Sequence, residues 1–129
     1  MTHDVQIVFC DDIRREDNGK LLFVGVYPED LVPSALPSNI LMSVWISIKE
    51  LSVGVHKMRL RFDFPNEKHI EVDGQVSVKE PNRVTSLVYA GLLVTLERPG
   101  EIKASLKFGD GPYFDIGSLP VRAPWEKKS

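Results

Sequence analysis

The sequence predicts an all-β fold, an antiparallel two-sheet sandwich of the immunoglobulin-like kind with about eight strands. Apolar side chains alternate with charged ones over residues 57–64 and with charged or polar ones over residues 101–108, which is the period of a strand with one buried face. Glycines and prolines separate these runs, and no segment carries a helical stripe of useful length. Many short strands joined by such turns indicate a sandwich or a barrel, and the unequal strand lengths favour the sandwich.

The remaining strands are predicted from weaker versions of the same pattern. A third apolar row runs from Ile40 to Ile48. Residues 21–27 and 86–96 are apolar on both faces, so we expect them in the middle of a sheet or beneath a loop. Gly25 and Gly91 lie within them and predict bends. The other candidates are residues 5–9, 69–78 and 113–121.

Three dipeptides predict tight reversals of the chain. Asn18-Gly19 and Asp110-Gly111 each lie between two strand candidates, and both pairs tolerate the positive φ angles that hairpin turns require. Asp73-Gly74 is ambiguous, because the apolar positions keep their phase across it from Ile70 to Val78. A turn and a bulge within a continuous strand both fit this pair.

Length and composition indicate one globular domain. The chain has 129 residues, a hydrophobic content of 43% and a net charge of −2, which fits a single core and gives no general bias toward nucleic acid or anionic membranes. We expect the domain to span residues 1–122, followed by a short tail over 123–129. The single cysteine, Cys10, and the lack of a signal peptide or a long apolar run predict a cytoplasmic protein that does not enter a membrane.

Residues 11–17 form the densest cluster of charge and are expected to be an acidic loop. Four carboxylates in one loop could gather a hard cation such as calcium, which would suit a metal-dependent ligand-binding or hydrolytic domain. However, Arg14 and Arg15 lie among them and the spacing of an EF-hand is absent. Internal ion pairs are the favoured interpretation, and no metal or other cofactor is predicted. The candidate ligands are Asp11, Asp12, Glu16 and Asp17.

Cys10 is the only candidate for a thiol nucleophile. A catalytic cysteine needs a lowered pKa and a base within reach. The adjacent carboxylates of Asp11 and Asp12 would raise the pKa of the thiol, and the three histidines are scattered along the chain. We therefore expect Cys10 to be a small buried residue at a strand end.

One strand face is basic. Lys57, Arg59 and Arg61 share a face of one predicted strand, and Lys103 and Lys107 share a face of another. If those strands are neighbours, the five side chains would form a stripe able to meet phosphate or an acidic partner. No regular interleaving of aromatic residues suggests base stacking, so nucleic-acid binding is a disfavoured alternative and a solvated sheet surface is preferred.

Two tryptophans are candidates for contact with a partner. Trp45 lies among serines on an otherwise polar strand face, and tryptophan is enriched at protein interfaces. Burial of Trp45 beneath residues 27–37 explains the pattern equally well. Trp125 is a second candidate, either for docking against the body of the domain or for contact with a second subunit.

The segment from Phe9 to Tyr27 carries a resemblance to a known family. Its elements are Phe9-Cys10-Asp11-Asp12-Ile13-Arg14, Gly19-Lys20-Leu21 and Gly25-Val26-Tyr27. They resemble an uncharacterised family of small bacterial and phage-associated proteins, specifically over residues 9–27. The resemblance implies a compact β domain with no assigned activity, in which Asp12 and Arg14 pin the acidic loop to the sandwich.

The leading functional hypothesis is a non-enzymatic protein-binding or assembly domain of bacterial or phage origin. No nucleophile, base and oxyanion donors converge in the sequence. The partner would be an unidentified protein or a second copy of the chain, bound through a sheet face or an unpaired strand edge. The candidate contact residues are Trp45, Arg59 and Arg61.

Overall fold

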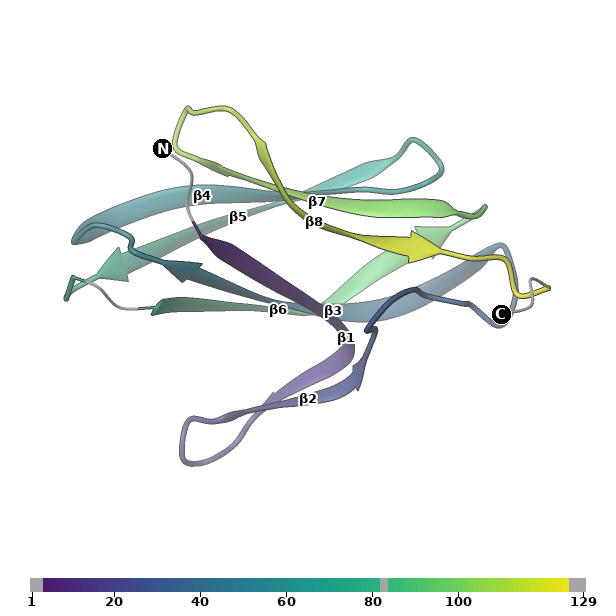
Figure 1. Ribbon diagram of the computed structural model, residues 1–129, viewed down its shortest axis with the longest axis horizontal. Coiled ribbons are helices and arrows are strands. Elements are labelled where there is room, and N and C mark those ends of the chain that lie inside the picture. Colours follow the sequence, from purple (N-terminus) through teal and green to yellow (C-terminus); the bar gives the residue numbers. More distant parts are fainter. Residues whose placement is uncertain (1–3, 82–83, 126–129) are drawn as a thin grey trace.

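The computed structural model describes residues 4–81 and 84–125, and this part of the chain is all β (Figure 1). It contains eight strands and no helix, which confirms the predicted fold class. The strands are β1 (Val5–Arg15), β2 (Leu21–Val26), β3 (Ser38–Lys49), β4 (Gly54–Asp63), β5 (His69–Val78), β6 (Val84–Leu96), β7 (Gly100–Phe108) and β8 (Phe114–Val121).

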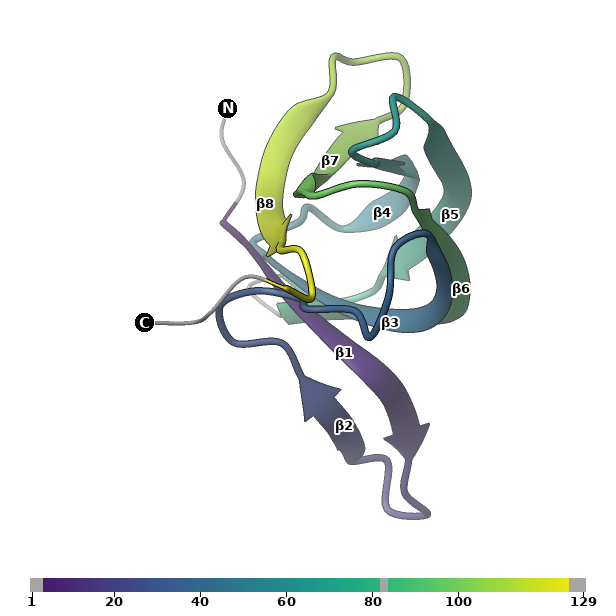
Figure 2. The ribbon, with the colours of Figure 1, turned by 90° about the vertical axis from the view of Figure 1, so that its right-hand side faces the viewer.

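The strands form two antiparallel four-stranded sheets that pack face to face (Figure 2). The strand order is β2-β1-β3-β6 in the first sheet and β5-β4-β7-β8 in the second. The alternation predicted for β4 and β7 is observed, because Leu60, Phe62, Ile102 and Leu106 are fully buried between the sheets. Their charged neighbours face outward, as expected for strands with one wet face.

Strand β1 is longer than the sequence predicted and divides into two parts. Residues Val5 to Cys10 pair with β3, whereas Cys10 to Arg15 pair with β2. The second part bends away from β3 and projects from the sandwich with β2 as a two-stranded ribbon (Figures 1 and 2). We call this ribbon, residues 11–26, the arm. Its tip is the turn predicted at Asn18-Gly19, where Gly19 has a φ of 86°.

The two strands that are apolar on both faces are not central, so this prediction was wrong. Strands β2 and β6 are the two edges of the first sheet, and both expose large aliphatic side chains. The predicted irregularity at Gly91 is present, because the register between β3 and β6 shifts between Met42 and Val44, opposite this glycine. Gly25 also has a positive φ, of 67°.

Asp73-Gly74 is neither a turn nor a bulge, because β5 continues through it in unbroken register with β4. A Cβ on Gly74 would lie 3.1 Å from the hydroxyl oxygen of Tyr89 in the opposite sheet. The missing side chain therefore makes room for a core tyrosine. Asp110-Gly111 lies in the β7–β8 connection, as predicted.

The connection between β2 and β3 is fastened to the second sheet. Leu31 pairs with Val121 at the end of β8. Next to this bridge, Arg122 Nε forms an ion pair with Asp30 at 2.6 Å. Ala123 is buried, and the boundary between domain and tail stays a prediction, since residues 126–129 lie outside the described part. Among the described residues no helix is long and apolar enough to cross a membrane.

Candidate binding surface

The base of the arm is built from Asp11, Gly25 and Tyr27. The hydroxyl of Tyr27 donates a hydrogen bond to the carboxylate of Asp11, and the backbone N–H of Tyr27 donates to the carbonyl of Phe9 at 2.9 Å. The Asp11 carboxylate reaches Tyr27 by crossing over Gly25, where a side chain would collide with it. Burial, followed by the bond to Asp11, raises the pKa of Tyr27 above its ordinary value.

One face of the arm presents a row of aliphatic side chains to solvent. Leu22, Val24 and Val26 alternate along β2 and are 47%, 42% and 47% exposed. Strand β2 pairs only with β1 within the described part of the chain. The row therefore lies beside an unpaired strand edge, the arrangement that invites an additional strand.

Trp45 supports the arm from the first sheet. Its ring is 5.6 Å from that of Phe23 in β2, centroid to centroid, and its indole N–H donates to the hydroxyl of Ser86 at 2.5 Å. The side chain is half-buried, with Phe23 as its aromatic neighbour. Trp125, by contrast, is exposed and does not dock against its own domain.

A second apolar pair lies on the first sheet beyond the arm. Leu41 of β3 and Leu93 of β6 are directly opposite each other in register and are 63% and 61% exposed. Cross-strand neighbours of this kind form one continuous surface. Most of the uncovered apolar side chains of this sheet thus lie in the arm and in this leucine pair, and Val84 at the start of β6 is also exposed.

The predicted basic stripe is present, because its two strands are neighbours, but acidic side chains of β4 and β5 pair with its arginines. Strands β4 and β7 are neighbours, and Arg59 is opposite Lys107 in register. On the other side, Arg59 Nε donates to Asp73 Oδ1 at 2.6 Å, which lowers the pKa of Asp73. Arg59 also lies 3.5 Å from Glu71. The sequence could not show these acidic partners until the β4–β5 pairing was known.

Arg61 is compensated in the same way. It forms an ion pair with Asp63 at 2.9 Å and a longer one with Glu71 at 3.7 Å. Its guanidinium and the ammonium of Lys107 lie 5.9 Å and 5.2 Å from the centre of the Tyr113 ring. The positive charges of Arg59, Arg61 and Lys107 thus already interact with groups of the same domain, which leaves them less able to bind a phosphate backbone.

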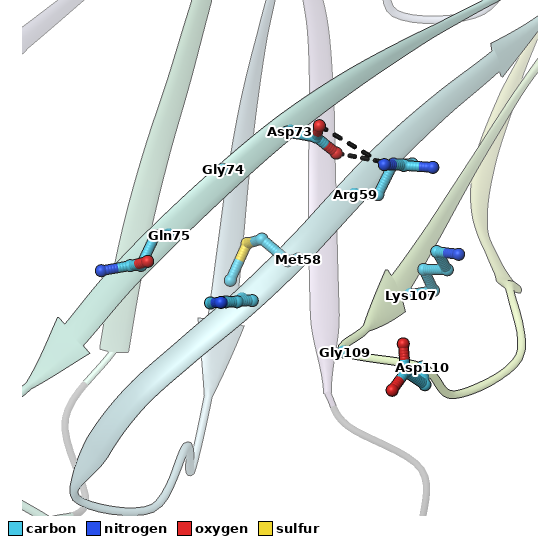
Figure 3. A pocket seen from close by; sticks show the side chains of 9 residues that line it. Met58, Arg59, Asp73, Gly74, Gln75, Lys107, Gly109 and Asp110 are labelled. Atoms are coloured by element: carbon cyan, nitrogen blue, oxygen red, sulfur yellow. Dashed lines mark hydrogen bonds and ion pairs between the residues drawn. The ribbon is translucent and has the colours of Figure 1, made fainter.

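A hollow of about 670 Å³ lies on this charged face (Figure 3). Figure 3 shows Arg59 and Asp73 facing each other across β4 and β5, with Lys107 and Asp110 beside them toward the β7–β8 connection. The volume falls within the range of ligand pockets, but such pockets are lined mainly by apolar side chains. The lining here is mostly charged or backbone, so its chemistry does not resemble that of a small-molecule site.

The acidic segment 11–17 is not a loop over most of its length. Asp11 and Asp12 belong to strand β1, and only Glu16 and Asp17 lie in the turn. Asp12 pairs with Arg14 at 3.0 Å, with side chains that are 46% and 72% exposed, so they bind each other and do not pin the arm to the sandwich. Within residues 4–81 and 84–125, no three His, Cys, Asp or Glu side chains are grouped as metal ligands.

Cys10 occupies the junction between the arm and the first sheet. It is paired with both Val26 and Ser43 and is fully buried. Its thiol donates to the carbonyl of Ser43 at 3.6 Å. Burial, and secondarily the charges of Asp11 and Asp12, raise the pKa of the thiol, which disfavours a thiolate.

A family model described as "Family of unknown function (DUF6941)" matches residues 6–121. The chain belongs to this family. The matched range spans nearly all of the sandwich and the whole arm, which is consistent with the expected membership of an uncharacterised family. The comparison with curated proteins found no match.

The sequence analysis drew attention to residues 9–27 but did not predict the arm that these residues build. The arm was not predicted, because charged residues over 11–15 appeared to end the first strand. The signal in the sequence was the run of leucine and valine residues in β2. Because this run is apolar on both faces, it was interpreted as buried, whereas one part of it is exposed.

Proposed function

We propose that this domain is a non-enzymatic protein-binding or assembly module, cytoplasmic and of bacterial or phage origin, that binds its partner through the arm. The observation that carries the proposal is the aliphatic row Leu22, Val24 and Val26, about half exposed on an edge strand. Natural proteins usually blunt such edges with charge, proline or a covering element. Strand β2 carries no charge and no proline, which supports a role as a binding edge.

The position of the arm also favours this role. It stands away from the body of the sandwich (Figure 2), and isolated two-stranded ribbons are only marginally stable in water. An added strand would bury the aliphatic row and enlarge the ribbon. The exposed pair Leu41 and Leu93 offers further apolar area to a partner that also reaches the sheet.

A site-specific photocrosslinker tests the proposal in the native cells. The residue p-benzoylphenylalanine would replace Val24 in the arm or Val55, an equally aliphatic residue of β4 that is 61% exposed. We expect ultraviolet light to give a discrete adduct from position 24 and none from position 55. If position 24 gives no adduct, or both positions give the same ones, the arm is not a binding element.

A further inference from the structure

We propose that the partner of the arm is a second copy of this chain, whose β2 pairs antiparallel with the first β2 about a twofold axis near Val24. This inference rests on the proposed function of the arm and names its occupant. It would join two ribbons into one four-stranded sheet in the order β1-β2-β2-β1. Twofold pairs of this kind are the commonest protein oligomers.

The aliphatic row is complementary to itself. Leu22 and Val26 lie two residues before and two residues after Val24, and all three side chains are exposed. Antiparallel pairing about Val24 places Leu22 of one copy opposite Val26 of the other. Both ends of the row are aliphatic and of similar size, so the paired rows would form an unbroken apolar strip.

The charges that flank β2 favour the same arrangement. Lys20 lies four residues before Val24 and Glu29 lies five residues after it, and both are exposed. An antiparallel pair brings Lys20 of each copy near Glu29 of the other. A parallel pair would instead bring like charges together, which is destabilising when they are directly opposite.

The shape of the chain permits this pairing. The arm extends away from the two sheets (Figures 1 and 2), so two copies joined by their arms would have their sandwiches on opposite sides of the ribbon. Three or more strands with an apolar face are needed for an independently stable sheet. The four-stranded ribbon meets that requirement, whereas the single arm does not.

The interface would be small. Six partly exposed aliphatic side chains and a short stretch of backbone cover less than the roughly 1,200 Å² of a standard stable interface. We therefore expect a reversible dimer, with a Kd on the order of micromolar. Molar mass should be measured by analytical ultracentrifugation from about 1 µM to about 500 µM, a range that spans such an equilibrium.

Two variants test the contact and its location. Val24→Lys places a charge in the paired row and should weaken the dimer at least about tenfold, while Val55→Lys on the second sheet leaves it unchanged. Both side chains are exposed, so equal melting temperatures would show that the variants are folded. A purely monomeric wild type, or a dimer that survives Val24→Lys, overturns the proposal.

A charge exchange tests the antiparallel direction. Lys20→Glu should weaken the dimer, and the double variant Lys20→Glu, Glu29→Lys should restore it, because each pair of opposite charges is re-formed with its signs reversed. Failure of the double variant to exceed the single variant overturns the antiparallel arrangement. A photocrosslinked adduct at position 24 with a protein of different mass would overturn self-association and leave the binding role of the arm intact.

Discussion

The carboxylate of Asp11 lies directly over Gly25, in the space that a side chain at residue 25 would occupy. A Cβ there would lie 2.8 Å from Cγ of Asp11 and closer still to Oδ2. Because the carboxylate crosses at this point, it reaches the hydroxyl of Tyr27. Asp11, Gly25 and Tyr27 thus act together to define the base of the arm.

Gly25→Ala should destabilise the domain more than Gly91→Ala. The two glycines have nearly the same φ, 67° and 69°, so the backbone cost of about 1–2 kcal/mol is shared. A Cβ at residue 91 meets nothing within 4 Å. The alanine at residue 25 should cost about 1 kcal/mol more, because Asp11 loses its bond to Tyr27. Denaturant unfolding measures both values.

The Asp11→Ala background provides the control for that comparison. With the carboxylate removed, alanine at residue 25 has nothing to displace, so its extra cost over alanine at residue 91 should disappear. If the extra cost persists without Asp11, the contact between Asp11 and Gly25 is not its source.

The core strands were predictable because one of their faces is buried. At β4 and β7 every second residue avoids water, and a register error of one residue would expose the whole row. Strand β1 was underestimated because the charged side chains between Asp11 and Arg15 extend beyond β3 into the arm, where charge does not prevent strand formation. Gly74 was ambiguous for a different reason, since the side chain that requires it, Tyr89, comes from the other sheet.

Stability should fall above about pH 10 partly because of Tyr27. Burial and the bond to Asp11 raise the pKa of Tyr27 in the folded state, whereas an unfolded tyrosine ionises near about pH 10. Above that pH the unfolded chain releases a proton that the folded chain retains, so alkali favours unfolding. Below it, both states hold the proton and the effect is absent.

Tyr27→Phe tests this pH dependence. Its unfolding free energy should decline less steeply above about pH 10 than that of the wild type, as measured by urea unfolding at a series of pH values. Asp11→Asn should give an intermediate slope, because the burial of Tyr27 remains while the charge of its partner is removed. Identical slopes for all three proteins would contradict the assigned role of Tyr27.

For the candidate contact residues, sequence spacing predicts the face of the strand but not the neighbouring side chains. Alternation correctly put Arg59 and Arg61 on an outer face, but only the β4–β5 register places Asp73 and Glu71 opposite them. Trp45 was singled out as a partner contact or as a side chain buried beneath residues 27–37, and its ring neighbour in the structure is Phe23, on a strand that reaches it through the fold of the arm. Spacing along one strand cannot identify the residues that another strand brings alongside.

Phe23→Ala should loosen the arm from the first sheet. The variant removes the ring that lies 5.6 Å from Trp45, a contact worth about 1 kcal/mol beyond its buried area. The chain has two tryptophans, so a Trp125→Phe background isolates the emission of Trp45. We expect a red shift and stronger quenching by iodide.

Leu22→Ala is the matched control in the same strand. Leu22 lies next to Phe23 but is exposed on the other face of β2, so its truncation should leave the emission of Trp45 unchanged. Equal spectral changes in the two variants would show that the ring contact does not hold the arm.

Arg122→Ala should destabilise the domain far more than Arg14→Ala, although both remove an arginine from an ion pair. Asp30 is only 6% exposed in its side chain, with Arg122 Nε 2.6 Å away, whereas the side chains of Asp12 and Arg14 are 46% and 72% exposed. Removing Arg122 leaves a buried carboxylate without that partner, at a cost of about 1–3 kcal/mol. An exposed pair contributes less than about 1 kcal/mol. Adding Asp30→Asn to Arg122→Ala should recover part of the lost stability, because the buried group is then neutral. Denaturant unfolding of the wild type, the two single variants and the double variant measures these differences. Equal losses in the two single variants would contradict a structural role for the Asp30–Arg122 pair.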